Sequence, residues 1–126
     1  MQRTMLKSKI HRATVTDSNL DYAGSISIDA ELMNLADIRE FEEVTVLDIN
    51  NGARFTTYAI KGQPGEVCLN GAAARLVHRG DLVILLTYVD LDERELADHT
   101  PGIVVVDEDN RPLPDYRRER ISHSSG

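Results

Sequence analysis

The chain lacks the residues on which several large classes of protein depend. It has one cysteine, no tryptophan, four tyrosines and two phenylalanines in 126 residues. A single cysteine, Cys68, excludes an internal disulfide and a metal site built from cysteines. Its place in an apolar, alternating segment indicates a buried structural thiol. The four histidines do not have the spacing of a zinc site, so we expect no bound metal.

Long apolar segments are also missing. No stretch approaches the roughly 20 residues that cross a bilayer, and no apolar run follows the basic residues near the start. We therefore expect a cytoplasmic protein with no membrane partner. No glycine-rich phosphate loop and no local serine-protease signature is present. The net charge of −7 argues against nucleic acid as a partner.

The length and the apolar pattern predict a mainly β protein. A chain of this size forms one domain, here residues 1–126. Alternation of apolar and polar residues predicts strands at residues 4–16, 26–28, 44–49, 55–60, 67–69, 82–89 and 103–106. Six or seven short strands with small helical inserts favour a β-barrel or a sandwich over a doubly wound sheet.

The remaining segments predict turns, short helices and a tail. Asp29 can cap a short helix, and residues 17–19 and 50–52 have the composition of turns. Further helical inserts are expected at residues 72–76 and 92–98. The end of the chain is polar and charged, so we expect a mobile tail over about residues 110–126.

The segment Tyr22-Ala23-Gly24-Ser25 has the most distinctive chemistry. The Ser25 hydroxyl can add to the Gly24 carbonyl, which moves the acyl group from nitrogen to oxygen. Elimination of that ester leaves dehydroalanine, and hydrolysis then gives a pyruvoyl group at a new chain terminus. Gly24 suits this step because glycine tolerates strained backbone angles and lets other groups approach its carbonyl. An isolated Gly-Ser pair is more often an ordinary turn, so the assignment depends on other motifs.

Two predicted strands carry polar side chains suited to binding and proton transfer. Lys9 and His11 share one strand face, where Lys9 could pair with a carboxylate and His11 could assist self-cleavage. Arg54 and Tyr58 share the face of another strand, and Thr57 points to the opposite side. Arginine can grip a carboxylate with two hydrogen bonds, and tyrosine can donate a proton. Each pattern taken alone is more often an ordinary solvated strand face.

The segment Asn70-Gly71-Ala72-Ala73-Ala74 offers backbone rather than side-chain chemistry. Its small side chains leave N–H groups accessible, and these can bind an anion or a carbonyl oxygen. A simple turn from strand to helix explains the same residues.

Taken together, these segments resemble the aspartate 1-decarboxylases, pyruvoyl-dependent enzymes that make β-alanine for pantothenate and hence coenzyme A synthesis. The resemblance covers most of the first ninety residues and little after Glu95. It is carried, in order, by Arg3-Thr4-Met5-Leu6-Lys7-Ser8-Lys9-Ile10-His11-Arg12, Tyr22-Ala23-Gly24-Ser25, Asn51-Gly52-Ala53-Arg54-Phe55-Thr56-Thr57-Tyr58-Ala59-Ile60, Asn70-Gly71-Ala72-Ala73-Ala74 and Gly80-Asp81-Leu82-Val83-Ile84.

The resemblance implies a fold, an assembly and a cofactor. The fold would be a double-psi β-barrel with short helical inserts, assembled as a homotetramer whose active sites lie between neighbouring subunits. The proenzyme would cleave itself between Gly24 and Ser25 into a β chain, residues 1–24, and an α chain, residues 25–126. The cofactor would be a covalent pyruvoyl group derived from Ser25, with no metal and no pyridoxal phosphate. Whether maturation needs a helper protein stays open.

The resemblance also implies a role for each candidate residue. The ketone derived from Ser25 would form a Schiff base with L-aspartate, and Tyr58 would donate the proton that replaces CO2. The substrate-binding residues would be Lys9, Arg54, Thr57, Gly71, Ala72 and Ala73. The residues of self-cleavage would be Gly24, Ser25, Thr57, His11, Tyr22 and Asn70.

Three other interpretations stay open at this point. A non-catalytic binding module with the same barrel would have the same strand pattern, because one fold hosts many functions. A precursor that never matures would have the same Gly24–Ser25 pair. A decarboxylase of another amino acid is the third, although the cations Lys9 and Arg54 favour a substrate with two carboxylates.

Overall fold

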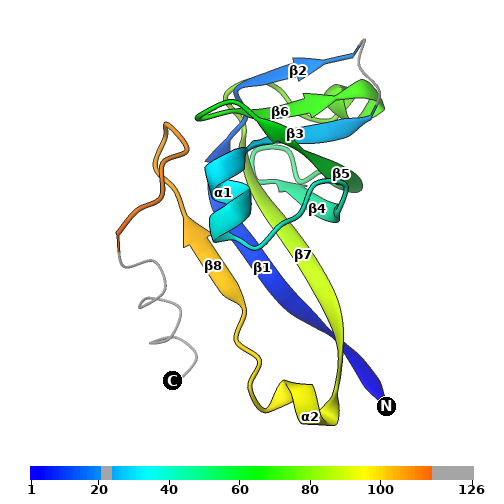
Figure 1. The fold of residues 1–126 in the computed structure, drawn as a ribbon. Coiled ribbons are helices and arrows are strands. Elements are labelled where there is room, and N and C mark those ends of the chain that lie inside the picture. Colours follow the sequence, from blue (N-terminus) through cyan, green and yellow to red (C-terminus); the bar gives the residue numbers. More distant parts are fainter. Residues whose placement is uncertain (21–23, 115–126) are drawn as a thin grey trace.

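The computed structural model describes residues 1–20 and 24–114. These residues form eight strands, two short α-helices and one 3-10 helix, so the expectation of a mainly β protein with helical inserts is confirmed (Figure 1). In chain order the elements are β1 (Gln2–Thr14), β2 (Asp17–Asn19), β3 (Ser25–Asp29), α1 (Ala30–Leu35), β4 (Glu43–Asp48), β5 (Arg54–Gly62), β6 (Val67–Asn70), the 3-10 helix η1 (Gly71–Arg75), β7 (Leu82–Asp92), α2 (Glu93–Leu96) and β8 (Gly102–Val105).

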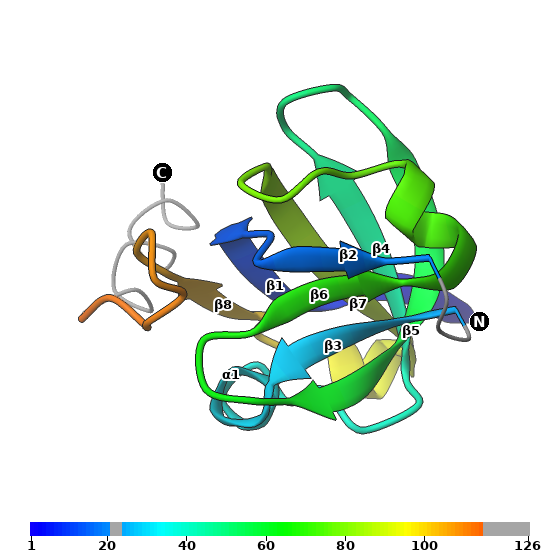
Figure 2. The same ribbon diagram turned by 90° about the horizontal axis from the view of Figure 1, so that it is seen from above.

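The strands form one strongly curved sheet in the order β2-β6-β3-β5-β4-β7-β1-β8. Three pairs are parallel, namely β1 with β8, β2 with β6 and β3 with β5, and the others are antiparallel. The sheet wraps around its core so that β2, at one end of the order, follows in the chain from β1, near the other (Figure 2). This is a barrel-like arrangement, as expected.

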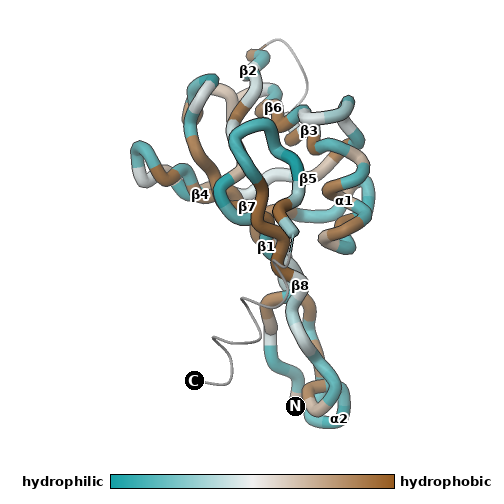
Figure 3. The backbone as a smooth tube through the Cα atoms, turned by 90° about the vertical axis from the view of Figure 1, so that its left-hand side faces the viewer, coloured by the Kyte–Doolittle hydropathy of each residue, from teal (hydrophilic) through white to brown (hydrophobic). Residues whose placement is uncertain are grey.

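The inside of the barrel is apolar because alternate residues of each strand point inward. Ile10, Leu85 and Val46 are paired across β1, β7 and β4, and all three are fully buried. Ile26 on β3 and Leu69 on β6 continue the core on the other side. Figure 3 shows these apolar segments gathered in the barrel, with hydrophilic residues on the loops.

The first residues of β1 and the last of β7 extend beyond the barrel as a two-stranded arm with α2 at its tip (Figures 1 and 3). We define the arm as residues 2–6 of β1, residues 88–92 of β7, and α2. The Thr4 hydroxyl donates to Asp90 at 2.7 Å, and Arg3 pairs with Glu93 at 3.1 Å. Among the described residues, no helix is long and apolar enough to cross a membrane.

Most of the local predictions are confirmed, and one is wrong. Asp29 caps α1 by accepting from the Glu31 and Leu32 N–H groups, and Gly52 adopts a φ of 77° in the predicted hairpin. The turn predicted at residues 17–19 is the short strand β2. These residues pair in parallel with β6, and that tertiary pairing outweighs the local preference of Asp, Ser and Asn for turns.

The segment after β8 returns to the barrel through Asn110, which is 1% exposed. Its side-chain oxygen accepts from the Thr14 N–H, and its amide nitrogen donates to the carbonyls of Thr14 and Gly65. The expected tail therefore begins with an anchored residue. The part of that tail over residues 115–126 lies outside the described residues.

Candidate active site

Ser25 is the first residue of β3 and is 2% exposed. It lies opposite Asn70, the last residue of β6, and the Asn70 Nδ2 donates to the Ser25 Oγ at 2.9 Å. The same amide group donates to the Ser27 Oγ at 3.1 Å. The Cys68 thiol donates to the Asn70 Oδ1 at 3.4 Å, so both ends of the Asn70 amide are held. These contacts fix the serine hydroxyl in a buried polar cluster.

Gly24 is exposed immediately before this buried serine. Beyond its chain neighbours, no atom lies within 4 Å of the place that a Cβ would occupy, and its φ is not in the left-handed region. The backbone there is not of the strained kind that only glycine adopts. What the structure shows is open space at the Gly24 Cα, on the side where a side chain would stand.

Strand β5 lies beside β3 and carries the second group of candidates. Ile26 pairs with Ala59, and this parallel register places Tyr58 beside Ser25. Arg54 and Tyr58 are exposed, with Tyr58 at 38%, whereas Thr57 between them is half-buried on the other face. The alternation predicted for this strand is confirmed. Arg54 lies four residues before Tyr58, which is about 13 Å along a strand.

The residues after Asn70 form η1 and extend the same end of the barrel. Gly71 is buried with a φ of 71°, a conformation that favours glycine, and it turns the chain from β6 into η1. Ala72 is exposed and Ala73 is half-buried. The structure therefore brings Ser25 and Asn70 together with the start of η1 and with the Thr57–Tyr58 part of β5.

Lys9 and His11 lie on a different part of the barrel, strand β1. Lys9 on β1 pairs with Leu86 on β7, Leu86 with Thr45 on β4, and Thr45 with Thr56 on β5. Lys9 and Tyr58 therefore lie on strands that β7 and β4 separate in the order of the sheet.

His11 is half-buried and has an unusual electrostatic environment. Burial, and then the neighbouring charges of Lys9 and Arg12, lower the pKa of His11 below its ordinary value. Its Nδ1 is buried and has no hydrogen-bond partner among the described residues. The neutral imidazole is therefore favoured near pH 7, which is the form that can accept a proton.

One predicted site residue lies outside the described part of the chain, and one polar neighbour of Ser25 was not predicted. Tyr22 lies outside the described residues. Ser27 was missed, although it shares the Asn70 amide with Ser25. Alternation along a strand places residues two apart on one face, so its position two residues after Ser25 was the available signal. Among the described residues, no three His, Cys, Asp or Glu side chains are grouped as a metal site.

Comparison with known proteins assigns the chain to a family. The family model for aspartate decarboxylase matches residues 1–113. The aspartate 1-decarboxylase of Thermoanaerobacter pseudethanolicus is 56% identical over 115 residues, which cover 90% of this chain and 98% of that protein. That of Heliobacterium modesticaldum is 53% identical over 127 residues, covering 99% and 96% respectively. That of Syntrophobacter fumaroxidans is 57% identical over 115 residues, covering 90% and 93%.

The fold is a mainly β barrel in which a buried serine follows an exposed glycine. The matched sequences then identify the family. The chain belongs to the aspartate decarboxylase family. The resemblance noted from the sequence motifs is confirmed.

Proposed function

We propose that this chain decarboxylates L-aspartate to β-alanine and CO2 with a pyruvoyl group made from its own Ser25. Membership of the family establishes the reaction class, a carboxy-lyase that acts on aspartate in pantothenate biosynthesis. The proposal that Ser25 becomes a pyruvoyl group rests on its buried hydroxyl, which accepts a hydrogen bond from Asn70 and follows an accessible Gly24.

The residues around Ser25 fit the formation of that group. In self-cleavage the Ser25 Oγ bonds to the Gly24 carbonyl carbon, and the Gly24–Ser25 amide bond breaks. Elimination then removes the Cα proton and breaks the bond from Cβ to Oγ, so Oγ leaves as a carboxylate oxygen of Gly24 and residue 25 becomes dehydroalanine. Water converts the dehydroalanine to the pyruvoyl group and releases ammonia. The Asn70 N–H that donates to Oγ in the uncleaved chain is directed at the atom that gains negative charge in the elimination.

The pyruvoyl group, once formed, supplies a carbonyl that accepts the substrate amine and takes up the electrons released with CO2. The side chains of the protein bind the substrate and deliver a proton. Tyr58, which precedes the Ala59 that pairs with Ile26, would donate its phenol proton to the substrate carbon that lost the carboxylate. The Gly71–Ala73 backbone, which follows Asn70, would contact the substrate from the opposite side. Thr57 would assist both cleavage and binding from β5.

The two cations that would hold the substrate carboxylates lie on different parts of the barrel. Arg54 is on the same strand as Tyr58, whereas Lys9 and His11 are three strands away. Therefore we place Lys9 and His11 at the active site of a neighbouring copy in a homotetramer. Two exposed rings support such an assembly, since Tyr58 on β5 and Tyr88 at the base of the arm are 38% and 42% exposed in the single chain.

The intact mass of the purified protein under denaturing conditions tests self-cleavage. We expect two fragments that split at Gly24–Ser25, the larger one blocked by a pyruvoyl group, and β-alanine formed from L-aspartate. A single chain that stays uncleaved after warming, and also after addition of lysate from the source organism, would contradict the proposal. Cleavage only with lysate would mean that maturation needs a helper protein.

A subunit-mixing experiment tests whether the active site is shared. Lys9→Ala and Tyr58→Phe are both expected to be nearly inactive alone. If the two residues act in one site but come from different copies, co-expressed mixed tetramers contain some sites with both residues intact, and activity returns. If both residues came from the same copy, every site would lack one of them. Mixing would then restore nothing.

A further inference from the structure

Phe41 combines two features that its place in a surface loop does not explain. Its side chain is 72% exposed, and its backbone has a φ of 74°. The left-handed region is unfavourable for a bulky residue, and an exposed turn of this kind ordinarily carries Gly, Asn or Asp. Asp37, in the same loop, follows that preference with a φ of 56°. An exposed phenylalanine in a strained conformation therefore points to a role beyond folding.

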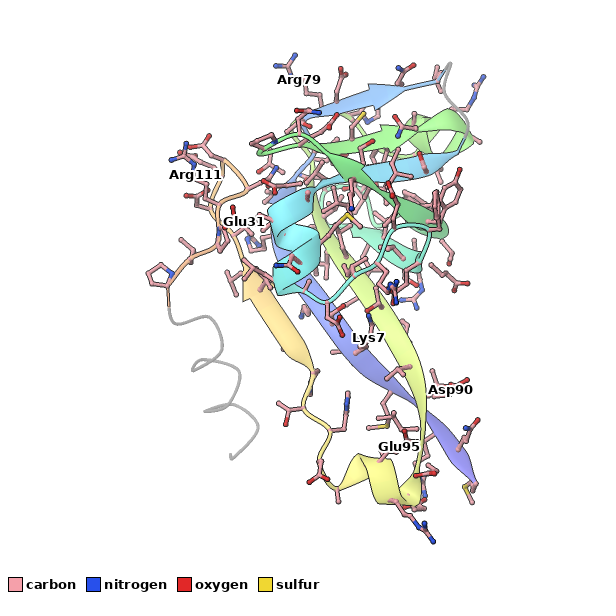
Figure 4. All side chains as sticks on the ribbon, in the orientation of Figure 1. Lys7, Glu31, Arg79, Asp90, Glu95 and Arg111 are labelled. Carbon is pink, nitrogen blue, oxygen red and sulfur yellow. The ribbon has the colours of Figure 1, made fainter. Side chains whose placement is uncertain are left out.

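The loop of residues 37–42 holds Phe41 rigidly against β5. The Phe41 N–H donates to the Ala59 carbonyl at 2.7 Å, and the Ala59 N–H donates to the Glu42 carbonyl at 2.9 Å. On the other side Lys7 pairs with the Glu42 carboxylate at 2.8 Å and donates to the Asp37 carbonyl. Lys7 comes from β1, where the arm joins the barrel (Figure 4). The loop is thus fixed to two strands.

The Phe41 ring lies against the ring of Tyr58. Their centroids are 6.5 Å apart and their planes are tilted by 43°. This distance is within the range in which aromatic pairs attract one another. Tyr58 points to the open outer face of β5, where its neighbour on β4 is Glu43. A half-exposed tyrosine on such a face can adopt more than one rotamer, and the Phe41 ring occupies one side of it.

We propose that Phe41 is a positioning residue for the proton donor Tyr58. The ring of Phe41 restricts the phenol of Tyr58 to the orientation in which it can donate to the substrate, and Phe41 itself exchanges no proton. This inference rests on the proposed role of Tyr58. The strained backbone of Phe41 is then the consequence of placing an aromatic ring where the loop geometry favours asparagine or glycine.

Three substitutions separate the ring from the backbone. Phe41→Asn removes the ring and relieves the unfavourable φ, Phe41→Leu keeps apolar bulk without a ring, and Phe41→Tyr keeps the ring. For Phe41→Asn and Phe41→Leu we expect kcat to fall about two- to tenfold, the range that loss of one aromatic contact corresponds to. The KM for L-aspartate, the extent of self-cleavage and the native oligomeric mass should stay as in the unmodified protein. Phe41→Tyr should restore kcat.

These variants also test the competing interpretation, that Phe41 only contacts a neighbouring subunit. Subunits that dissociate in Phe41→Leu and Phe41→Asn alike, with unchanged kcat in the tetramer that remains, would assign the ring to assembly and overturn the proposal. An unchanged kcat in all three variants, or an equal loss in Phe41→Tyr, would overturn it as well.

A second measurement needs no catalysis. NMR of the uncleaved Ser25→Ala protein, labelled with ¹³C on its tyrosine rings, reports the Tyr58 ring once Tyr58→Phe has identified its signal. Adding Phe41→Leu should shift that signal through loss of the ring current, and adding Phe41→Tyr should leave it nearly in place. An unshifted Tyr58 signal would contradict positioning by Phe41. Failure of the proposed function is distinguished from this because the unmodified protein would then make no β-alanine.

Discussion

The Nδ2 atom of Asn70 lies 2.9 Å from the Oγ of Ser25 and donates a hydrogen bond to it. The donor therefore sits on the oxygen that leaves with Gly24 in the proposed cleavage. Replacing it tests this directly, because Asn70→Asp keeps the size of the side chain and exchanges the donor for an acceptor. We expect self-cleavage to slow by about a hundredfold, as for loss of one oxyanion donor.

The rate is measured as the disappearance of the full-length chain by mass spectrometry after warming. Asn70→Ala, which removes donor and acceptor together, should be slowed as well. Cleavage of Asn70→Asp at the unmodified rate would remove Asn70 from the processing machinery.

Ser25→Ala should give a folded, uncleaved and inactive chain, because the attacking hydroxyl is absent. Ser27→Ala is the matched control, since Ser27 lies on the same face of β3 and accepts from the same Asn70 amide at 3.1 Å. It should still cleave at Gly24–Ser25 and form β-alanine. Decarboxylation by uncleaved Ser25→Ala would defeat the pyruvoyl mechanism.

Tyr58→Phe should still cleave itself and bind L-aspartate, but turn over about 10² times more slowly or worse, because the proton donor is gone. Tyr88→Phe is a suitable control, as Tyr88 is another half-exposed tyrosine and lies on β7, at the base of the arm. Steady-state kinetics of β-alanine formation separate kcat from KM in both variants. An unimpaired kcat in Tyr58→Phe would exclude Tyr58 as the acid.

The carboxyl groups of Asp48 and Asp81 give the fold a dependence on pH. Burial, and then a hydrogen bond with Asp81, raises the pKa of Asp48, although the Asn50 and Asn51 N–H groups favour its charged form. The same hydrogen bond lowers the pKa of Asp81. The buried Oδ2 of Asp48 has no other partner among the described residues, so a proton held on Asp48 and directed at Asp81 accounts for the two opposite shifts in pKa.

The two shifts act in opposite directions on stability. Since the pKa of Asp48 is raised on folding, its contribution is complete below the unfolded pKa and is lost as pH rises through the folded pKa. The contribution of Asp81, whose pKa is lowered, is present above its unfolded pKa and is lost as pH falls through its folded pKa. Above the unfolded pKa of both groups, only the loss at Asp48 still changes with pH.

Asp48→Asn should therefore weaken the fall in stability with rising pH, because an amide keeps the oxygen that accepts from Asn50 and can donate to Asp81 without titrating. The test is urea unfolding of the uncleaved Ser25→Ala chain at a series of pH values that starts at about 4, near the unfolded pKa of both groups, and rises from there. Asp109→Asn, at an exposed carboxylate, should leave the pH profile unchanged. A profile of Asp48→Asn as steep as that of its parent would contradict the shared proton.

Deleting residues 116–126 should leave self-cleavage and activity intact, because the described contacts of the preceding segment are retained, from those of Asn110 to the Leu113 N–H that donates to the Val105 carbonyl at 2.8 Å. Asn110→Ala, by contrast, should lower the free energy of unfolding by about 1–3 kcal/mol, since buried partners at Thr14 and Gly65 lose a hydrogen bond. Thermal unfolding and a β-alanine assay compare the two. An inactive truncated enzyme would mean that the tail contributes to the structure or to the active site.

Local patterns in the sequence predicted most strands of the barrel, because alternation along a strand and the cap of a helix depend on neighbouring residues. Alternation in residues 55–60 fixed which side chains of β5 are exposed, and Asp29 before an apolar helical segment predicted the cap of α1. The strand at Asp17–Asn19 could not be predicted in this way. Its partner is β6, fifty residues further along the chain, and nothing in a run of Asp, Ser and Asn indicates that pairing.

The same distinction applies to the candidate site, where residues could be predicted but their contacts could not. Asn70 and Ser25 could be named from motifs, but their pairing in register is a product of the fold. The same is true of Phe41, whose contact with Tyr58 depends on a loop that bends back onto β5. The separation of Lys9 from Tyr58 also appears only once the strand order β5-β4-β7-β1 is known.

Gly24 lies between β2 and β3, so cleavage after it would divide the strands of one barrel between two chains. A cut there leaves β1 and β2 on a fragment of 24 residues, and these strands still pair with β7, β8 and β6 of the remainder. The barrel would fold as one chain and then persist as two associated chains, which is a case of fragment complementation. Its stability then depends on protein concentration, and dilution would favour loss of the fragment. Because cleavage converts Ser25, a chain of residues 25–126 that lost residues 1–24 could not be processed a second time.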